Sequence, residues 1–138
     1  MEHSFNFDSK RIGILIANLG TPDSPTKKDL KKYLNQFLMD KRVIDFPRIL
    51  WIIILKLVIL NIRPKKSAKL YKKIWTENGS PLLCFSKSII DKLKDHFDEN
   101  VVIMLGMRYG SPSINEAMDF FKKEKISKIL CLIQTSLN

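Results

Sequence analysis

An arginine and a tyrosine, Arg108 and Tyr109, directly follow an apolar stretch that predicts a buried strand over 101–107. A second apolar stretch, 11–17, ends in a break with the sequence NLGTP over 18–22. In open α/β sheets, ligands bind outside the carboxyl ends of the strands. Both junctions are therefore candidate binding edges, and they lie side by side if the two strands are neighbours. The alternative for Arg108 is an ion pair with a surface carboxylate.

The residue types give little support for a dinucleotide-binding, histidine-based or metal site. The break after the first strand contains a single glycine, Gly20, whereas a dinucleotide-binding loop needs three in the pattern G-x-G-x-x-G. The two histidines, His3 and His96, are expected to have surface or packing roles. Cys84 and Cys131 lie far apart and outside any C-x-x-C spacing, which predicts reduced thiols rather than a disulfide or a zinc site. No catalytic residue and no metal ligand is assigned.

The elements that position these junctions alternate between strand and helix signals, which predicts an α/β fold with a short parallel sheet. Strands are expected over 11–17, 101–107 and 127–133, and helices over 24–38, 49–62, 65–75, 82–97 and 113–121. Ser24 is expected to cap the first helix, with Pro25 in its first turn. The pair Arg63-Pro64 predicts a break between two helices. A serine at 113 and a glutamate at 116 form a capping-box pattern.

Length and composition predict one compact domain over 11–138. The chain has 138 residues, of which 45% are hydrophobic and 28% charged, enough for a modest core and too apolar for a disordered chain. Residues 1–10 are polar and are expected to form a flexible N-terminus. They lack the apolar run of a secretory signal, so we expect a cytoplasmic protein.

The net charge of +10 is concentrated in one part of the chain. Between Phe46 and Thr76 there are eight lysines and arginines and no acidic residue. This block is either a solvated helix face or a surface for an anionic partner such as a lipid, a phosphate or a carboxylate. No nucleic-acid motif accompanies it, so a nucleic-acid partner is not expected.

Within that block, residues 49–62 (ILWIIILKLVILNI) are apolar around the whole helical wheel except at Lys56 and Asn61. Fourteen residues are too few to span a bilayer. The segment is either a buried core helix or an apolar lip that touches a membrane or a large apolar ligand. With the basic residues that follow, it predicts a peripheral membrane contact over 49–73.

Several motifs occur together in one order: ANLGTPDSP, FLMDKRVID, RPKKSAKLYKKIW followed by NGSPL, and MRYGSPSINEAM. Their order and approximate spacing resemble the ferrochelatase family, whose enzymes insert ferrous iron into a porphyrin to make haem. The match runs from about Arg11 to about Ile133, which is nearly the whole chain.

The resemblance implies two Rossmann-like three-layer domains with a porphyrin cleft between them, of which this chain is the first. The substrates would be protoporphyrin IX and Fe²⁺, with no cofactor. By position, the resemblance implies six porphyrin-binding residues: Leu19, Arg63, Tyr71, Ser80, Arg108 and Tyr109. A porphyrin is an apolar disc with carboxylates on one rim, so an apolar surface with a few donors suits it. Packing roles remain the alternative for Leu19 and Tyr71, and a turn role for Ser80.

The resemblance also implies that the family's catalytic histidine and acidic partner lie beyond the end of this chain. The final residues, 133–138, depart from the family's Tyr-Pro-Gln-Tyr-Ser stretch. Two hypotheses follow. The chain belongs to a working ferrochelatase, with a separate C-terminal half and a place at the inner membrane surface. Alternatively, it is a non-catalytic porphyrin-binding half-domain or the remnant of an interrupted gene.

Overall fold

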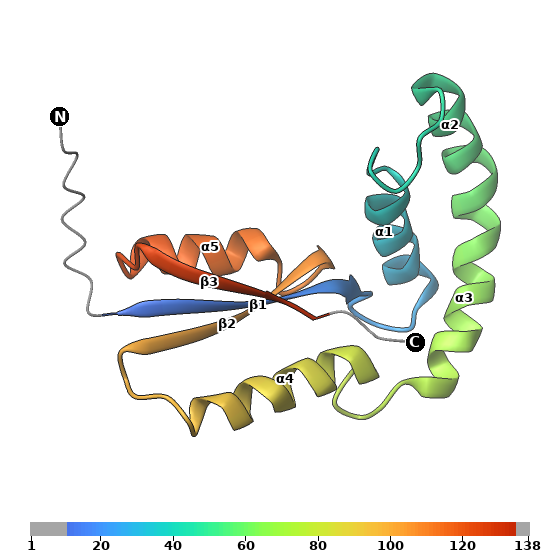
Figure 1. The fold of residues 1–138 in the computed structure, drawn as a ribbon. Coiled ribbons are helices and arrows are strands. Elements are labelled where there is room, and N and C mark those ends of the chain that lie inside the picture. The colour runs from blue at the N-terminus through green and yellow to red at the C-terminus, as the bar shows by residue number, and fades with distance from the viewer. Residues whose placement is uncertain (1–10, 135–138) are drawn as a thin grey trace, which may run out of the picture. The chain divides into compact units, whose positions relative to one another are not determined.

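A computed structural model describes residues 11–134 and has the predicted α/β class (Figure 1). The predicted flexible segment 1–10 lies outside the described residues. The elements, in chain order, are β1 (Ile12–Thr21), α1 (Lys27–Leu38), α2 (Arg48–Ile54), the π-helical turn η1 (Leu55–Ile59), α3 (Leu60–Ile74), α4 (Pro81–Lys94), β2 (Val101–Gly110), α5 (Ile114–Lys123) and β3 (Lys128–Ile133).

The three strands form one parallel sheet in the order β2-β1-β3, with β1 in the centre. The register between β1 and β3 pairs Ile12 with Lys128 and continues to Ala17 with Ile133. Most of β1 is buried on both faces, which explains why its sequence is continuously apolar rather than alternating. The predicted parallel sheet and its three strands are therefore confirmed.

The chain divides into two compact units. The first, here called the sheet unit, comprises 11–18, 86–108 and 112–134 of the described chain. Figure 1 shows α5 on one face of the sheet and α4 on the other, which gives the three layers of a Rossmann-like fold. A Cβ on Gly13 would lie 2.9 Å from Cε1 of Phe121, a fully buried residue of α5. A glycine in β1 thus lets α5 pack closely on the sheet.

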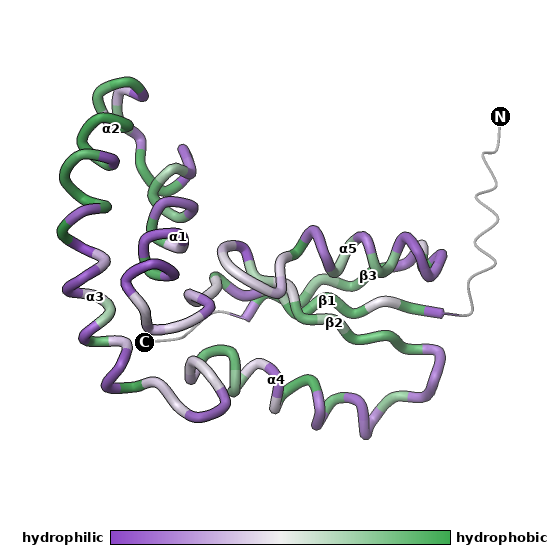
Figure 2. The backbone as a smooth tube through the Cα atoms, turned by 180° about the vertical axis from the view of Figure 1, so that it is seen from behind, coloured by the Kyte–Doolittle hydropathy of each residue, from purple (hydrophilic) through white to green (hydrophobic). Residues whose placement is uncertain are grey.

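The second unit, here called the helical unit, comprises 19–85 and 109–111. Helices α1 and α3 lie side by side in it (Figures 1 and 2). Its core consists of Tyr33, Leu34, Leu38, Leu55, Leu60 and Tyr109. The indole Nε1 of Trp51 in α2 donates a hydrogen bond of 2.8 Å to the carbonyl oxygen of Leu38, which ties α2 to the end of α1.

Two strands extend further than the sequence predicts. The expected break at 18–22 is wrong because β1 continues to Thr21, and β2 continues through Arg108 and Tyr109 to Gly110. Gly20 has a φ of +119°, and a Cβ there would overlap the backbone carbonyl of Tyr109. A glycine at this position lets the ends of the two strands meet more closely than a larger residue allows.

The cap of α1 also differs from the prediction. Thr26, not Ser24, is the N-cap, and its Oγ1 accepts a hydrogen bond of 3.3 Å from the backbone N–H of Asp29. The Ser24 hydroxyl donates instead to the Asp29 carboxylate, which stabilises the loop before the helix. Both residue types favour caps, so the sequence alone could not distinguish between them.

The predicted break at Arg63-Pro64 is wrong, because α3 runs through it from Leu60 to Ile74. A proline inside a helix removes the hydrogen bond to the carbonyl four residues earlier, here that of Leu60. Leu60, Pro64 and Ala68 are all buried and recur every four residues, so they form the packed face of α3. Burial of this face outweighs the lost hydrogen bond, and α2, η1 and α3 follow one another as a helical run over 48–74.

Candidate functional site

Three tyrosines of the helical unit lie near one another: Tyr33 in α1, Tyr71 in α3 and Tyr109 at the end of β2. The Tyr33 hydroxyl donates a hydrogen bond of 3.2 Å to the carbonyl oxygen of Gly20. The Phe37 ring stacks with Tyr33 at a centroid distance of 6.3 Å and meets Tyr109 edge-on at 5.1 Å. Aromatic packing thus connects α1 with the end of β2.

The pKa values of two of these tyrosines, Tyr33 and Tyr71, are raised. Burial, with smaller contributions from Tyr71 and Tyr109, raises the pKa of Tyr33 to about 12. Burial also raises the pKa of Tyr71 above its ordinary value. Both phenols therefore stay protonated at neutral pH and cannot serve as bases. Because the Tyr33 proton already bonds to the Gly20 carbonyl, Tyr71 is the one of the two that can donate to a ligand.

Tyr109, which the sequence predicts as a site residue, is buried, and its hydroxyl donates a hydrogen bond of 3.0 Å to Oδ2 of Asp40. Leu19 is 53% exposed and lies next to Gly20, the residue that Tyr33 contacts. The structure therefore brings three of the predicted residues, Leu19, Tyr71 and Tyr109, to the neighbourhood of Tyr33.

The other three predicted residues are Arg63, Ser80 and Arg108. Arg63 is exposed on α3, eight residues before Tyr71, which corresponds to roughly 12 Å along a helix. Ser80 is buried and its hydroxyl accepts a hydrogen bond of 3.2 Å from the N–H of Leu83, so it caps the start of α4. Arg108 is exposed and belongs to the sheet unit. Porphyrin binding by all six residues stays a prediction.

The apolar segment 49–62 combines the two roles that the sequence left open. Leu55 and Leu60 are buried in the core of the helical unit. Six other large apolar residues are exposed and are here called the apolar strip: Ile49, Leu50, Ile53, Leu57, Val58 and Ile62. The exposed fraction reaches 79% at Ile49 and 68% at Leu57, and Figure 2 shows the hydrophobic colouring of this part of the backbone. A patch of this kind marks a surface for a partner, a ligand or a membrane.

No helix within 11–134 is both long enough and apolar enough to cross a bilayer.

Sequence reasoning missed three polar residues near the end of β2. Tyr33 lies within the helix expected over 24–38, and a phenol on a buried face usually has a hydrogen-bond partner, which was the only sequence signal for it. Asp40 accepts the hydrogen bond from Tyr109, and the side-chain oxygen of Gln36 accepts one of 3.0 Å from the N–H of Gly110. Asp40 lies within the FLMDKRVID motif, which was the only sequence signal for it.

In the sheet unit, buried polar side chains lie where β1 and β3 end. The Asn18 amide donates hydrogen bonds to the Ser86 hydroxyl at 3.2 Å and to Oε1 of Gln134 at 3.0 Å. The Ser86 hydroxyl also donates to Oε1 of Gln134, at 3.0 Å. Because these neutral groups satisfy one another, this network is suited to holding the strand ends together rather than to acid-base chemistry.

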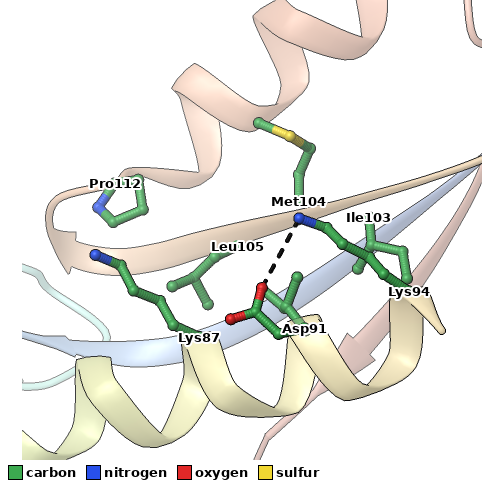
Figure 3. Close-up of a pocket in the computed structure, with 8 residues that line it drawn as sticks. Lys87, Asp91, Lys94, Ile103, Met104, Leu105 and Pro112 are labelled. Carbon is green, nitrogen blue, oxygen red and sulfur yellow. Dashed lines mark ion pairs between the residues drawn. The ribbon is translucent and has the colours of Figure 1, made fainter.

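A cavity of about 290 Å³ lies between α4 and β2 in the same unit (Figure 3). Ile90, Ile103 and Leu105 contribute apolar side chains to it, and Lys87 and Lys94 contribute charged ones. Lys94 forms an ion pair of 4.0 Å with Asp91, another lining residue. None of the six predicted site residues lines this cavity.

Metal ligands do not gather in the part of the chain that the structure describes: no three His, Cys, Asp or Glu side chains there could hold an ion together. Cys84 and Cys131 are free thiols, as their spacing predicts.

Comparison with known proteins identifies the family. The sequence model of the ferrochelatase family matches residues 11–137. A ferrochelatase from Alcanivorax borkumensis is 45% identical over 135 residues, which cover 95% of this chain and 40% of the relative. One from Actinobacillus pleuropneumoniae serotype 3 is 51% identical over 128 residues, covering 91% of the chain and 40% of the relative. One from Idiomarina loihiensis is 47% identical over 126 residues, covering 88% and 35%. The chain thus spans 35–40% of the length of these curated relatives, and over nearly all of its own length it belongs to the ferrochelatase family.

Proposed function

We propose that this chain supplies one wall of the porphyrin-binding cleft of a ferrochelatase, an enzyme of haem biosynthesis that inserts ferrous iron into protoporphyrin IX. The observation that carries the proposal is the composition of the helical unit. It combines the protonated phenols of Tyr33 and Tyr71 with exposed apolar side chains at Leu19 and along the apolar strip. The sequence motifs of the family cover the same residues.

This composition suits the chemistry of the ligand. A porphyrin buries a large apolar disc, while its propionate carboxylates need charged or hydroxyl donors. Leu19 and the apolar strip would contact the disc. The Arg63 guanidinium and the Tyr71 phenol, both on α3, would bind the polar rim.

Iron insertion also requires removal of two pyrrole N–H protons, which is work for a base. Tyr33 and Tyr71 are unsuited to it because a raised pKa makes the phenolate harder to form. In the proposed enzyme, this chain binds and orients the porphyrin, and the remainder supplies the base and the groups that deliver the iron. The apolar residues Leu130, Leu132 and Ile133 of β3 are exposed and offer a surface on which further parts of such an enzyme would pack.

A titration with protoporphyrin tests the proposal. Quenching of Trp51 and Trp75 and the shift of the porphyrin absorption band would report binding. We expect saturable binding that Arg63→Ala and Tyr71→Phe each weaken by more than about threefold, the loss of one charged or hydroxyl contact. Lys122→Ala, which removes an exposed positive charge from α5, is the control and should leave the affinity unchanged.

Two results would contradict the proposal. If Arg63→Ala and Tyr71→Phe titrate like the parent chain, these residues do not bind the porphyrin. If the chain unfolds cooperatively yet shows no saturable binding, the wall is not preformed in this chain and porphyrin binding requires the rest of the enzyme. Urea unfolding of each variant shows whether a lost signal reflects binding or folding.

A further inference from the structure

A cavity of about 490 Å³ in the helical unit is lined almost entirely by positively charged side chains. We call it the basic cavity, and its lining residues are Lys28, Lys31, Lys32, Asn35, Lys56 and Leu60. The residues at 28, 31, 32 and 35 follow the spacing of one helix face, so they line the cavity from α1. Lys56 lines it from η1 and Leu60 from α3. A volume of this size is typical of pockets that bind small molecules.

The lysines of the basic cavity are placed unfavourably for the stability of α1. All four lysines of this helix, at 27, 28, 31 and 32, lie in its first half, and its last turn contains no basic residue. Positive side chains are disfavoured near the N-terminus of a helix, where the helix dipole is itself positive. Lys28 also lies one helical turn from both Lys31 and Lys32, and like charges at this spacing destabilise a helix. A bound anion would offset both effects.

Carboxylates of the described chain compensate only one of the lysines that line the cavity. Asp23 forms an ion pair of 2.9 Å with Lys32, and its hydrogen bond and charge raise the pKa of that lysine. Within 11–134, no carboxylate lies within ion-pair distance of Lys28, Lys31 or Lys56. Three positive charges therefore line the cavity without an ionic partner from this part of the chain.

The number of uncompensated charges indicates the class of anion. A single carboxylate or a phosphodiester carries one negative charge, which leaves most of the positive charge of the cavity unmatched. A phosphate group carries up to about two negative charges at neutral pH, so a diphosphate matches three lysines. Lysine ammonium groups are common phosphate ligands, and Asn35 adds an amide donor to the lining.

We propose that the basic cavity binds a small soluble anion that carries a diphosphate group. The anion bridges Lys28 and Lys31 of α1 and Lys56 of η1, and it offsets the repulsion among them. It thereby ties the first half of α1 to the π-helical turn. This site is separate from the proposed porphyrin wall, because none of the six predicted porphyrin residues lines the basic cavity.

Calorimetric titration of the full 138-residue chain with sodium diphosphate tests the proposal. Sodium chloride keeps the ionic strength constant, because screening alone affects a chain of net charge +10. The test variant is Lys28→Gln/Lys31→Gln/Lys56→Gln. The control variant, Lys92→Gln/Lys122→Gln/Lys123→Gln, removes the same charge from exposed positions of the sheet unit.

We expect one saturable site in the parent chain and an affinity at least about tenfold weaker in the test variant, because charge-assisted hydrogen bonds are lost. The control variant should lose about twofold at most, since it changes only the net charge. Equal losses in the two variants, or a folded parent chain without saturable binding, would overturn the proposal. Orthophosphate that binds as tightly as diphosphate would contradict the choice of a diphosphate.

A single substitution tests whether η1 takes part in the site. Lys56→Gln should weaken diphosphate binding by about threefold or more, because it removes the only lysine that lines the cavity from outside α1. Lys66→Gln, at an exposed position of α3 in the same helical run, is the matched control. Equal affinities in these two variants would show that no bridge to η1 forms.

Urea unfolding gives a readout that a general loss of stability would not reproduce. Without diphosphate, the test variant should be at least as stable as the parent chain, because the repulsion on α1 is relieved. Saturating diphosphate should raise the unfolding midpoint of the parent chain and leave that of the test variant unchanged. An equal rise in both would contradict binding at these lysines.

Protoporphyrin distinguishes this site from the proposed porphyrin site. The affinity for protoporphyrin should be the same in the test variant and the parent chain, with or without diphosphate. If protoporphyrin displaces diphosphate, the lysines bind its propionates and the separate anion site is wrong. If diphosphate binds and protoporphyrin does not, this proposal stands and only the proposed function fails.

Discussion

Helix α5 follows the local rules of helix stability, whereas the helical run over 48–74 departs from several of them. Ser113 and Glu116 form a complete capping box at the start of α5, as the sequence predicts. Glu116 lies in the first turn of α5 and Lys122 and Lys123 lie in the last, which matches the helix dipole. On its inner face, Ala117 and Phe121 are fully buried against the sheet.

The helical run has none of these features at its start. Pro47 precedes α2 without a side-chain cap, and the first turn contains no acidic residue. A π-helical turn, η1, interrupts the α-helical pattern, and Pro64 lies inside α3. Much of its apolar surface, including Ile49 and Leu57, faces solvent.

The contrast between α5 and the helical run indicates which of the two has a binding role. In α5 the local sequence, the cap and the packing all favour the same helix, as is expected of an element whose role is structural. Where several local rules are broken together, as in 48–74, the broken rules point to a binding role. The proposed contacts with the porphyrin and the predicted contact with the membrane lie on this run or next to it.

The largest expected effect is on the packing of α5. Phe121→Ala should lower the free energy of unfolding by about 3–5 kcal/mol, because it leaves a cavity against Gly13 and Leu15 in the core of the sheet unit. Leu57→Ala in the apolar strip should change it by about 0.5 kcal/mol at most. Urea unfolding of both variants measures the contrast. Similar losses would show that the apolar strip is part of a core, and the comparison would fail.

A smaller effect is expected at the cap of α5. Ser113→Ala should cost about 1 kcal/mol, because the backbone N–H of Glu116 loses its acceptor. Urea unfolding at neutral pH, with Ser111→Ala on the loop before the helix as control, would measure it. An unchanged free energy of unfolding would contradict the role of the capping box.

The same cap predicts a pH dependence. Hydrogen bonds from the backbone N–H and the hydroxyl of Ser113 hold the pKa of Glu116 below its ordinary value of 4.5. A lowered pKa in the folded state stabilises the protein above pH 4.5, and this contribution is lost as the pH falls through the folded pKa. Glu116→Gln should therefore flatten the loss of stability below that pH in acid unfolding. A parallel pH profile in the variant would show that the cap does not depend on the charge.

The smallest effect on stability is expected in the apolar strip. Ile53→Ser/Leu57→Ser should change the free energy of unfolding by about 0.5 kcal/mol or less, because both residues are exposed. The same variant should bind neutral vesicles at high salt at least about tenfold more weakly, since two apolar contacts are lost while charges are screened. Leu130→Ser/Leu132→Ser on β3, also exposed, is the control. Equal vesicle binding by parent and variant would remove the membrane role of the strip.

Much of this fold was predictable because its signals are local. The apolar run at 101–107 and the capping-box pattern at 113 and 116 each depend on neighbours a few residues away, and the structure confirms both. Tyr71 and Trp75 are four residues apart, the spacing of neighbours on one side of a helix, and their ring centroids lie 6.2 Å apart.

The predictions of element ends were wrong where contacts between residues distant in the sequence determine the structure. β1 extends to Thr21 because Gly20 allows it to meet the end of β2, almost ninety positions along the chain. α3 continues through Pro64 because Leu60 and Ala68 pack the same face into the core. Neither contact could be predicted from the residues that neighbour it in the sequence.

Residue types and their order were enough to predict the α/β class, the family and most of the polar residues proposed to bind porphyrin. The folded structure was needed to show which face of 49–62 is buried, that Tyr33 lies among the other phenols, and that Lys56 lies beside lysines of α1. These features depend on how α1 packs against η1 and α3, and such packing follows from burial and hydrogen bonding between segments rather than from the pattern within any one of them.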